Sequence, residues 1–453
     1  MPLPYTHQVD TCFAPAVAGG LTPSEFNAAL QRTTGALDKL RSWHADGSLP
    51  LLRLAAARDD LVAVKRIADR FRREFNDVVI LGTGGSSLGG QALYALSDLG
   101  FGPPPGSPRL RFLDNIDPAT FEALFKSVRL ARTGFVAISK SGSTAETMTQ
   151  LIICLDALRR EGLKLADHVA VITEQKNNVM RRMAASHGFA ILDHDPNIGG
   201  RFAGLTNVGL LPALARGLDV EALREGASTV VSSMLDAKRA AEFAPAIGAA
   251  IAIGLAKERD VRASVMLPYA DRLARFAAWY VQLWGESLGK DGEGVTPVAA
   301  LGPVDQHSQL QLYLDGAPQH LVTVIREACE GRGPRLAPDL AKLVGAEYLA
   351  GHAAGDLVAA EQRAIPEALI AHGRPVRTID LEVLDERALG ALMMHFMVET
   401  ILAAHLLGVD PFGQPAVESG KMLTRRYLAG APAEPTDGHS SAAARPRQPH
   451  RRG

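Results

Sequence analysis

The sequence predicts an α/β protein of two doubly wound parallel-sheet domains, each in three layers (α/β/α), with helical extensions at both ends. The first observation is a series of short, continuously apolar runs that alternate with segments of helical spacing, as in parallel strands buried on both faces. The second is that these runs fall into two groups, at 77–192 and at 263–379. The third is that a glycine-rich and a hydroxyl-rich turn each follow directly on a strand.

The individual elements follow from the same patterns. The first group predicts strands at 77–81, 110–113, 133–138, 168–173 and 189–192, and the second predicts strands at 263–267, 320–325 and 376–379. Apolar segments at 243–256 and 389–407 predict core helices. Thr22 and Ser24 are candidate caps for an N-terminal helix, and Asp271 is a candidate cap for a long helix that ends near Leu288.

These elements divide the chain into five parts. We expect an irregular or helical N-terminal extension at 1–55, a first sheet domain at 56–235 and a second at 236–410. A C-terminal helix at 411–430 and a tail at 431–453 complete the chain. The tail is rich in Ala, Pro, Ser and Arg and cannot bury enough apolar surface to order itself, so we expect it to be disordered.

The bulk composition excludes several classes of protein. Of 453 residues, 47% are hydrophobic and 21% charged, which suits a chain with a buried core. The net charge of −1 offers no general attraction to nucleic acid or to an anionic membrane, so we expect neither as a partner. Cys12, Cys154 and Cys329 are too widely spaced for a disulfide framework or a zinc site. We find no secretory signal and no uncharged apolar stretch of spanning length, and therefore expect a cytoplasmic protein.

A hydroxyl-rich segment follows the strand at 133–138 and leads into a helix at about 145–161. Its polar side chains are those of Ser139, Lys140, Ser141, Ser143, Thr144 and Thr147. A helix N-terminus favours an anion, and hydroxyls donate hydrogen bonds to phosphate oxygens. The alternative is a capping box, in which Ser143 or Thr144 pairs with a following Glu. Because the hydroxyls outnumber what a cap needs, the segment favours phosphate binding.

A glycine-rich segment at 82–90 follows the strand at 77–81. It is not the dinucleotide-binding fingerprint, because Ser87 stands where the third glycine should be, and no Walker lysine follows. Its glycines would let the backbone approach a ligand closely; the alternative is a tight turn between strand and helix. Both interpretations stay open from the residues alone.

Two further segments each hold one group with a possible chemical role. Arg201 follows two glycines and could place a fixed cation in a cleft; the alternative is a surface side chain after a turn. Glu286, flanked by Trp284 and Leu288 near the end of a helix, could act as a general base. Its alternative is an ion pair with Lys290 on the helix face.

Two more candidates lie in the second half of the chain. His307, in a polar loop beside Asp305, could act as an acid or a base; the alternative is a turn-capping Asp beside an incidental His. Lys421 begins a terminal helix, and its alternative is a solvated side chain. Together, the four candidates and the hydroxyl segment supply a base, an acid, a cation and a phosphate site. These are the groups that proton abstraction next to a carbonyl needs, and they include no cluster of metal ligands.

In this order the segments resemble the phosphoglucose isomerase family, whose members are built from two sugar-isomerase domains. The resemblance covers about residues 55–428. The stretches that carry it are 199–202, 412–421 and 286–290, together with the pair Gln306 and His307. The positions that depart from the family pattern are Ala203, Gly413 and Ala416, where the family usually has Ser or Thr, Asp and Gly.

The resemblance implies an activity and a set of site residues. The reaction is the reversible isomerisation of glucose 6-phosphate and fructose 6-phosphate in glycolysis and gluconeogenesis, by ring opening and a C1–C2 proton transfer through an enediolate, with no metal and no cofactor. Glu286 is implied as the base, Arg201 as the cation that stabilises the enediolate, and His307 and Lys421 as the groups that open the ring. The implied substrate-binding residues are Gly85, Ser86, Ser139, Lys140, Ser141, Thr144, Thr147 and Gln282. In the family the His comes from the neighbouring subunit, which implies a homodimer with a shared active site.

Three other functions stay open at this point. A phosphosugar-binding regulatory module would need the hydroxyl segment but not Glu286, His307 and Lys421 together, and the chain lacks a DNA-binding helix-turn-helix pattern or basic face. An isomerase that also accepts mannose 6-phosphate or an amino sugar would differ in pocket shape, and the chain has no glutaminase domain for amidotransfer. A dinucleotide-binding dehydrogenase conflicts with the broken glycine fingerprint.

Overall fold

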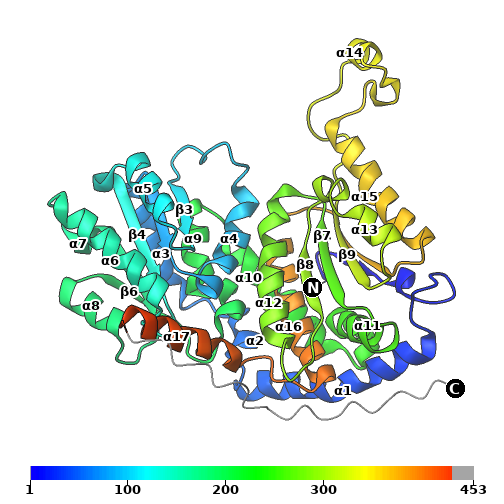
Figure 1. Ribbon diagram of the computed structural model, residues 1–453, viewed down its shortest axis with the longest axis horizontal. Coiled ribbons are helices and arrows are strands. Elements are labelled where there is room, and N and C mark those ends of the chain that lie inside the picture. The colour runs from blue at the N-terminus through cyan, green and yellow to red at the C-terminus, as the bar shows by residue number, and fades with distance from the viewer. Residues whose placement is uncertain (1, 431–453) are drawn as a thin grey trace. The chain divides into compact units, whose positions relative to one another are not determined.

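The computed structural model describes residues 2–430, and two sheets form its framework (Figure 1). The first sheet has the strand order β3-β2-β4-β5-β6 and the second has the order β8-β7-β9-β10-β1. Numbered in chain order within each parallel set, the first sheet reads 2-1-3-4-5 and the parallel strands of the second read 2-1-3-4, which is a doubly wound arrangement. The predicted fold class is therefore confirmed, and the two halves repeat one topology.

The first sheet is parallel throughout. Its strands are β2 (Asp77–Leu81), β3 (Arg109–Leu113), β4 (Thr133–Ile138), β5 (Val169–Thr173) and β6 (Ala190–Asp193). Every residue of β4 and β5 is buried, as a strand covered on both faces requires. Each strand lies within a residue of its predicted position, because continuous apolar runs are the clearest signal in the sequence.

The second sheet contains two strands that the sequence analysis missed. Its parallel strands are β7 (Ala263–Pro268), β8 (Thr296–Ala299), β9 (His320–Glu327) and β10 (Val376–Leu381), and β1 (Thr6–Gln8) pairs with β10 in the antiparallel direction. β1 lies in a segment that we expected to be irregular or helical, and it takes the place that β6 has in the first sheet. Both missed strands are short edge strands, and β8 contains Pro297, so neither has the apolar run of a central strand.

Helices fill the space between the sheets and cover their outer faces (Figure 1). The inner helices are α3 (Leu61–Glu74), α4 (Leu88–Tyr94), α9 (Asn207–Arg216), α10 (Val220–Asp236), α11 (Ala244–Glu258), α12 (Ala274–Leu288) and α16 (Glu386–Leu407), and they share one core with alternate residues of both sheets. The outer helices are α5 (Pro118–Ser127), α6 (Ala145–Arg160), α7 (Leu165–His168) and α8 (Val179–His187) on the first sheet, with α13 (Leu310–Asp315) and α15 (Ala354–Ala371) on the second. The opposite faces of the central strands thus belong to different cores, as the two-residue period of a strand requires.

Two predicted caps have different outcomes. Thr22 caps α1 (Pro23–Asp46) in a reciprocal capping box with Glu25, which confirms the N-terminal signal. Asp271 does not cap the long helix: it opens a short 3-10 turn, and α12 begins only at Ala274 without a side-chain cap. The short helix α2 (Pro50–Leu54) connects α1 to the first half.

Helix α16 is long and apolar enough to cross a membrane by length and composition, but 89% of its most apolar window is buried inside the protein. A core helix passes the same test, and the buried helix that we predicted at 389–407 is confirmed here.

From Gly413 onward the chain forms a separate unit that contains α17 (Glu418–Leu428). The division of the rest at residues 55, 235 and 410 stays a prediction. The predicted tail at 431–453 lies outside the described residues.

Candidate active site

The site begins at the carboxyl edge of the first sheet. β2 lies between β3 and β4, so the chain leaves β2 in one direction and later returns to its other side. In doubly wound sheets this switch point, where two neighbouring loops separate, is where ligands bind. The loops that separate here are the glycine segment at 82–90 and the hydroxyl segment at 139–147. They are close neighbours, because a Cβ on Gly82 would lie 3.0 Å from the carbonyl oxygen of Ile138.

The hydroxyl segment forms a compact turn ahead of α6. The hydroxyls of Ser139 and Thr144 lie 2.9 Å apart, and the N–H of Gly142 donates to Ser139 Oγ over 3.1 Å. Gly142 has φ +67°, a conformation that strains other residues. Ser141 accepts from the N–H and the hydroxyl of Ser143 at 3.3 Å.

The hydroxyls of this segment are not used as helix caps. Thr144 is the N-cap of α6, and its side chain makes no capping hydrogen bond. The hydroxyl of Thr147 is buried without a hydrogen-bond partner among the described residues. The capping-box alternative is therefore wrong: these hydroxyls bond to one another, and that of Thr147 has no partner within residues 2–430.

Lys140 extends from the same turn toward the segment that follows β6. Its ammonium donates to the carbonyl oxygen of Pro196 over 2.6 Å and lies 3.8 Å from the carboxylate of Glu174. Partial burial lowers the pKa of Lys140. The lysine thus places a positive charge next to the hydroxyl turn.

The glycine segment packs directly against the turn that carries Arg201. A Cβ on Gly85 would lie 2.2 Å from the carbonyl carbon of Gly200, so only glycine fits there. Gly84 has φ +55°, and a Cβ on it would lie 3.1 Å from Nε2 of Gln282. Ser86 ends the short turn at Gly84–Ser86. The glycines therefore bring three distant segments together, which explains why they do not follow the dinucleotide pattern.

Arg201 is buried and held at several points. Its Nε donates to Ser287 Oγ over 2.7 Å, one terminal nitrogen donates to the carbonyl oxygen of Pro411, and the other lies 3.3 Å from the carboxylate of Glu286. The indole N–H of Trp279 donates to the Arg201 carbonyl over 3.1 Å. Burial lowers the pKa of Arg201, and Glu286 opposes the shift. The surface-residue alternative for Arg201 is wrong, because the guanidinium is a fixed internal cation.

Glu286 lies on the last turn of α12, and its side chain is 26% exposed. It accepts a hydrogen bond from Nε2 of Gln282 over 3.0 Å. The other amide atom, Gln282 Oε1, is buried without a partner among the described residues. Lys290 does not pair with this carboxylate: its ammonium donates to the carbonyl oxygens of Ser287 and Asp410. The helix-face ion pair is therefore wrong, and Glu286 instead lies beside the buried guanidinium.

His307 makes no hydrogen bond or ion pair with this group among the described residues. His307 is exposed at the end of a 3-10 turn (Val304–Gln306), and its ring is unpaired within residues 2–430. Asp305 does cap this loop, since it accepts from the N–H of Leu301 over 2.7 Å. Lys421 lies on α17 and donates to Glu418 over 2.7 Å within its own unit. The structure thus brings together Gly85, Arg201, Gln282 and Glu286, while the roles of His307 and Lys421 stay predictions.

Sequence reasoning did not assign a function to Ser287. Its hydroxyl is fully buried and orients the Arg201 guanidinium. It directly follows Glu286 in the stretch 286–290, which is the signal that could have found it. Among residues 2–430, no three His, Cys, Asp or Glu side chains lie close enough to hold a metal ion.

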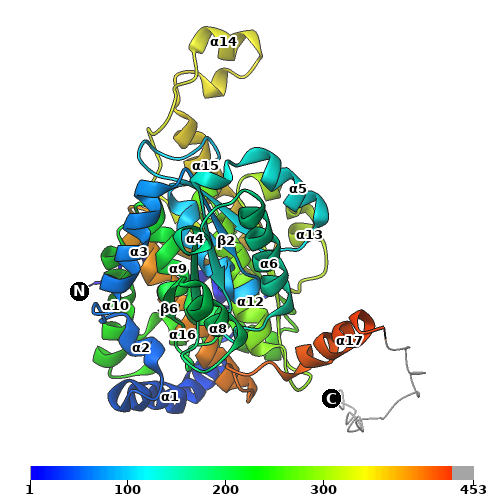
Figure 2. The same ribbon diagram turned by 90° about the vertical axis from the view of Figure 1, so that its left-hand side faces the viewer.

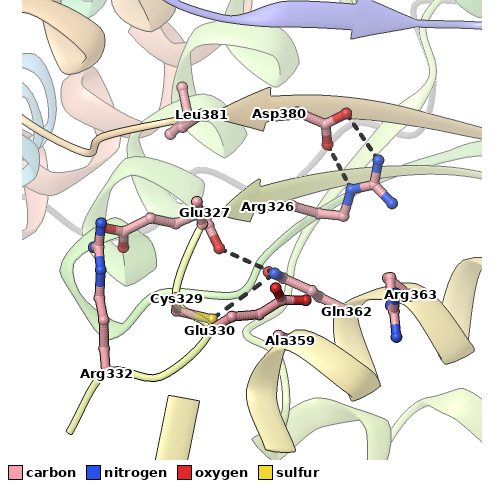
Figure 3. Close-up of a pocket in the computed structure, with 11 residues that line it drawn as sticks. Arg326, Glu327, Cys329, Glu330, Arg332, Ala359, Gln362, Arg363, Asp380 and Leu381 are labelled. Carbon is pink, nitrogen blue, oxygen red and sulfur yellow. Dashed lines mark hydrogen bonds and ion pairs between the residues drawn. The ribbon is translucent and has the colours of Figure 1, made fainter. Parts of the chain in front are cut away.

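The carboxyl edge of the second sheet also has a cavity, of about 450 Å³, where β9 and β10 end (Figure 3). Four of its charged side chains form two pairs: Arg326 donates to both carboxylate oxygens of Asp380, and Arg332 donates to Glu327 over 3.1 Å. Burial raises the pKa of the Cys329 thiol, which keeps it protonated. This edge therefore differs from the first sheet's hydroxyl turn in its chemistry.

Comparisons with known proteins agree with this geometry. The family model for phosphoglucose isomerase matches residues 67–308. A glucose-6-phosphate isomerase from Rubrobacter xylanophilus is 39% identical over 417 residues, which cover 90% of this chain and 94% of that protein. A crystal structure of a hypothetical protein from Thermus thermophilus has a TM-score of 0.82 and 32% identity, covering 94% of this chain and all of that one. The crystal structure of a glucose-6-phosphate isomerase from Chlamydia trachomatis shares the fold, with a TM-score of 0.72 and 22% identity. The match covers 84% of this chain and 78% of that one. The chain therefore belongs to the phosphoglucose isomerase family.

Proposed function

We propose that this chain interconverts glucose 6-phosphate and fructose 6-phosphate, in glycolysis and gluconeogenesis. The observation that carries the proposal is the Glu286 carboxylate, 3.3 Å from the Arg201 guanidinium and 3.0 Å from the Gln282 amide. A base beside a fixed cation is what proton removal next to a carbonyl requires. The relative from Rubrobacter xylanophilus is named for this reaction, which supports the proposal.

The substrate phosphate binds in the hydroxyl turn ahead of α6. Its ligands are Ser139, Ser141, Thr144 and Thr147, with Lys140 adjacent, at the N-terminus of α6, where the unpaired N–H groups of a helix favour an anion. Two observations support this assignment: the Thr147 hydroxyl has no partner among residues 2–430, and the side chain of Thr144, the N-cap residue of α6, makes no capping hydrogen bond. Gly85 and Ser86, in the neighbouring turn, contact the sugar.

Proton transfer takes place at Glu286. Its carboxylate removes the C2 proton, and negative charge develops on the neighbouring substrate oxygen. The Arg201 guanidinium is already oriented by Ser287 and Pro411, so it stabilises that charge without reorganising. Gln282 positions the sugar, since its buried Oε1 needs a hydroxyl donor. The same carboxylate returns the proton at C1, so one base serves both carbons.

The sugar ring opens before this step, with His307 and Lys421 moving protons at the ring oxygen and the C1 hydroxyl. His307 is exposed, and its ring has no hydrogen-bond partner within residues 2–430. An exposed imidazole on a well-anchored loop fits a group that acts in the active site of a second copy of the chain. This supports a homodimer with shared active sites.

A protruding segment supports the same assembly. Between β9 and α15 the chain forms an excursion that contains α14 (Pro338–Leu343) and stands away from the sheets in both views (Figure 1 and Figure 2). It exposes Leu340, Leu343, Val344 and Tyr348 by 60%, 78%, 73% and 76%. Clustered exposed apolar side chains are typical of protein interfaces. We also expect a cytoplasmic location, because charged sugar phosphates do not cross bilayers unaided.

The test is a coupled assay of glucose 6-phosphate formation from fructose 6-phosphate, with and without a chelator. We expect wild-type turnover that the chelator does not change. Glu286→Gln should lower kcat by at least about 10²-fold, as expected for loss of a general base, and still bind fructose 6-phosphate by calorimetry. Glu258→Gln, an exposed glutamate on α11, is the matched control.

Three outcomes would contradict the proposal. A wild-type chain without turnover rules out the reaction, and near-normal turnover in Glu286→Gln rules out this base. Activity lost to the chelator contradicts the metal-free mechanism.

A further inference from the structure

The loop that carries His307 is anchored by the side chain before it. Gln306 Oε1 accepts a hydrogen bond from the hydroxyl of Tyr269 over 2.9 Å, and Gln306 Nε2 donates to Glu361 over 3.0 Å. Tyr269 directly follows β7, and Glu361 lies on the outer helix α15. One amide therefore ties the loop to the sheet on one side and to a covering helix on the other.

The two partners of the Gln306 amide determine which way it is oriented. The carboxylate of Glu361 only accepts hydrogen bonds, so Nε2 must face it and Oε1 must face Tyr269. Burial, with a contribution from Glu361, raises the pKa of Tyr269, which keeps the phenol protonated as a donor. Turning the amide over would break both hydrogen bonds, so the arrangement fixes the orientation of Gln306.

The rest of the loop is held just as closely. Asp305 accepts from the N–H of Leu301 and from the hydroxyl of Ser308, each over 2.7 Å. The N–H of Gly302 donates to Pro268 over 2.9 Å, and a Cβ on Gly302 would lie 2.6 Å from the Tyr269 ring. A loop with this many fixed points nevertheless ends in an exposed imidazole that bonds to nothing among residues 2–430.

We propose that Gln306, anchored by Tyr269 and Glu361, is a positioning residue for His307. The three side chains hold the loop so that the imidazole stands where ring opening needs it, and none of them touches the substrate. A misplacement of about 1 Å can cost a reacting group about 10²-fold in rate, so an exposed catalytic side chain depends on its anchors. This inference rests on the proposed function and adds three residues that control its first step.

The experiment separates ring opening from proton transfer on the full chain. Ring opening is followed as enzyme-catalysed exchange between the α and β anomers of glucose 6-phosphate, by NMR. Proton transfer is followed as loss of deuterium from C2 of the same sugar. Glu361→Ala should slow anomer exchange by about tenfold, which is less than the about 10²-fold loss that a misplacement of about 1 Å can cause. Its KM should stay within about twofold of the wild-type value. Tyr269→Phe, which removes one hydroxyl, should have a smaller effect of about threefold.

Two comparisons make the result specific. Glu361→Gln keeps an acceptor oxygen for Gln306 and should restore most of the exchange rate. Glu367→Gln, an exposed glutamate on the same helix, should behave as wild type. Glu286→Gln should show the reverse pattern, with anomer exchange retained and C2 deuterium loss abolished.

The inference is wrong if anomer exchange in Glu361→Ala and Tyr269→Phe equals that of Glu367→Gln. It is also wrong if KM and C2 exchange change as much as anomer exchange, because that pattern indicates a general structural role. If Glu361→Ala does not fold, Tyr269→Phe decides the question. A wild-type chain that catalyses neither exchange contradicts the proposed function instead, so the two failures are distinguishable.

Discussion

The first four parallel strands of both sheets share the order 2-1-3-4, yet the carboxyl edges of the two sheets carry different side chains. After β4 in the first sheet come hydroxyls around Gly142 that no helix cap uses. In the second sheet, Arg326 near the end of β9 instead pairs with Asp380 near the end of β10, and Arg332, beyond β9, pairs with Glu327. Strand order thus places a possible ligand site at the carboxyl edge of each sheet. The side chains at the end of each strand decide which ligand chemistry that edge offers. The second half contributes Gln282 and Glu286 of α12 to the group around Arg201.

The largest expected effect is on the free energy of unfolding, because the two sheets also differ in the side chains that they bury. The fourth strand of the first sheet, β5, is apolar, whereas β10 carries Arg377, fully buried and paired with Glu399 at 3.0 Å. The Glu399 carboxylate also lies 2.9 Å from Nε2 of His395. We expect Glu399→Gln to lower the free energy of unfolding by about 3–5 kcal/mol, because a buried charge loses its partner. Denaturant unfolding measures this, and a loss below about 1 kcal/mol contradicts it.

The same pair predicts a dependence of stability on pH. Burial opposes ionisation of Glu399, yet Arg377 and His395 lower its pKa from 4.5 to about 2. A carboxyl whose pKa is lowered on folding stabilises the protein above its unfolded pKa, and that contribution is lost as the pH falls from about 4.5 toward 2. Glu399→Gln should therefore flatten the acid limb of the stability curve. An unchanged acid limb would show that other carboxyls control it.

The next largest effect is on kcat, and it distinguishes Arg201 beside Glu286 from Arg363 at the cavity of the second sheet. Arg201→Lys should lower kcat by about 10²-fold, because an ammonium cannot replace a guanidinium held in three directions beside the developing charge. Arg363→Ala, at the cavity of the second sheet, should change kcat by less than about twofold. Steady-state kinetics on both variants checks this. Equal losses in the two variants would mean that the second edge takes part in catalysis.

A smaller effect tests the phosphate site itself. Removing the hydroxyls of Ser139 and Thr144 together, as S139A/T144A, should raise KM for the phosphosugar by about tenfold or more, since each hydrogen bond to a charged group contributes about 1.5–3 kcal/mol. Cys329→Ser is the matched change after β9 and should leave KM within about twofold. A KM shift in Cys329→Ser as large as in the double variant would contradict the difference between the edges.

The smallest effect compares two glycines in equivalent loops. Gly142 (φ +67°) and Gly331 (φ +73°) both have left-handed backbones, so alanine costs about 1–2 kcal/mol of strain at either position. A Cβ on Gly142 would also lie 2.1 Å from Asn178 Oδ1, whereas Gly331 has nothing within 4 Å. We therefore expect only Gly142→Ala to raise KM, by a few fold, while both lose some thermal stability. Identical KM values in the two variants would contradict this.

The sequence predicts the strands of the first sheet well, because strands buried on both faces, such as β4 and β5, are apolar at nearly every position. It does not predict β1 or β8, since three or four residues at a sheet edge carry little apolar signal and pair only after the rest has folded. Asp271 shows a similar limit: a capping residue is present, but the chain makes a 3-10 turn before α12 begins.

For the site, the residue types could be predicted but their neighbours could not. Arg201 and Glu286 each had an ordinary surface interpretation, and only the fold brings them within 3.3 Å. The approach of Gly85 to Gly200 and the carbonyl of Pro411 at Arg201 join segments from three parts of the chain, so no local pattern contains them. The side chains that hold the His307 loop were missed for the same reason.

The central claim is that Glu286, beside Arg201 and next to the first sheet's glycine turn, transfers the proton between C1 and C2. The most direct measurement follows glucose 6-phosphate that carries deuterium at C2, in ordinary water, with wild type and with Glu286→Gln. We predict that wild type moves the label from C2, partly to solvent and partly to C1 of fructose 6-phosphate. The variant should do so at least about 10²-fold more slowly while still binding the sugar phosphate. Label transfer at the wild-type rate in Glu286→Gln would contradict the account.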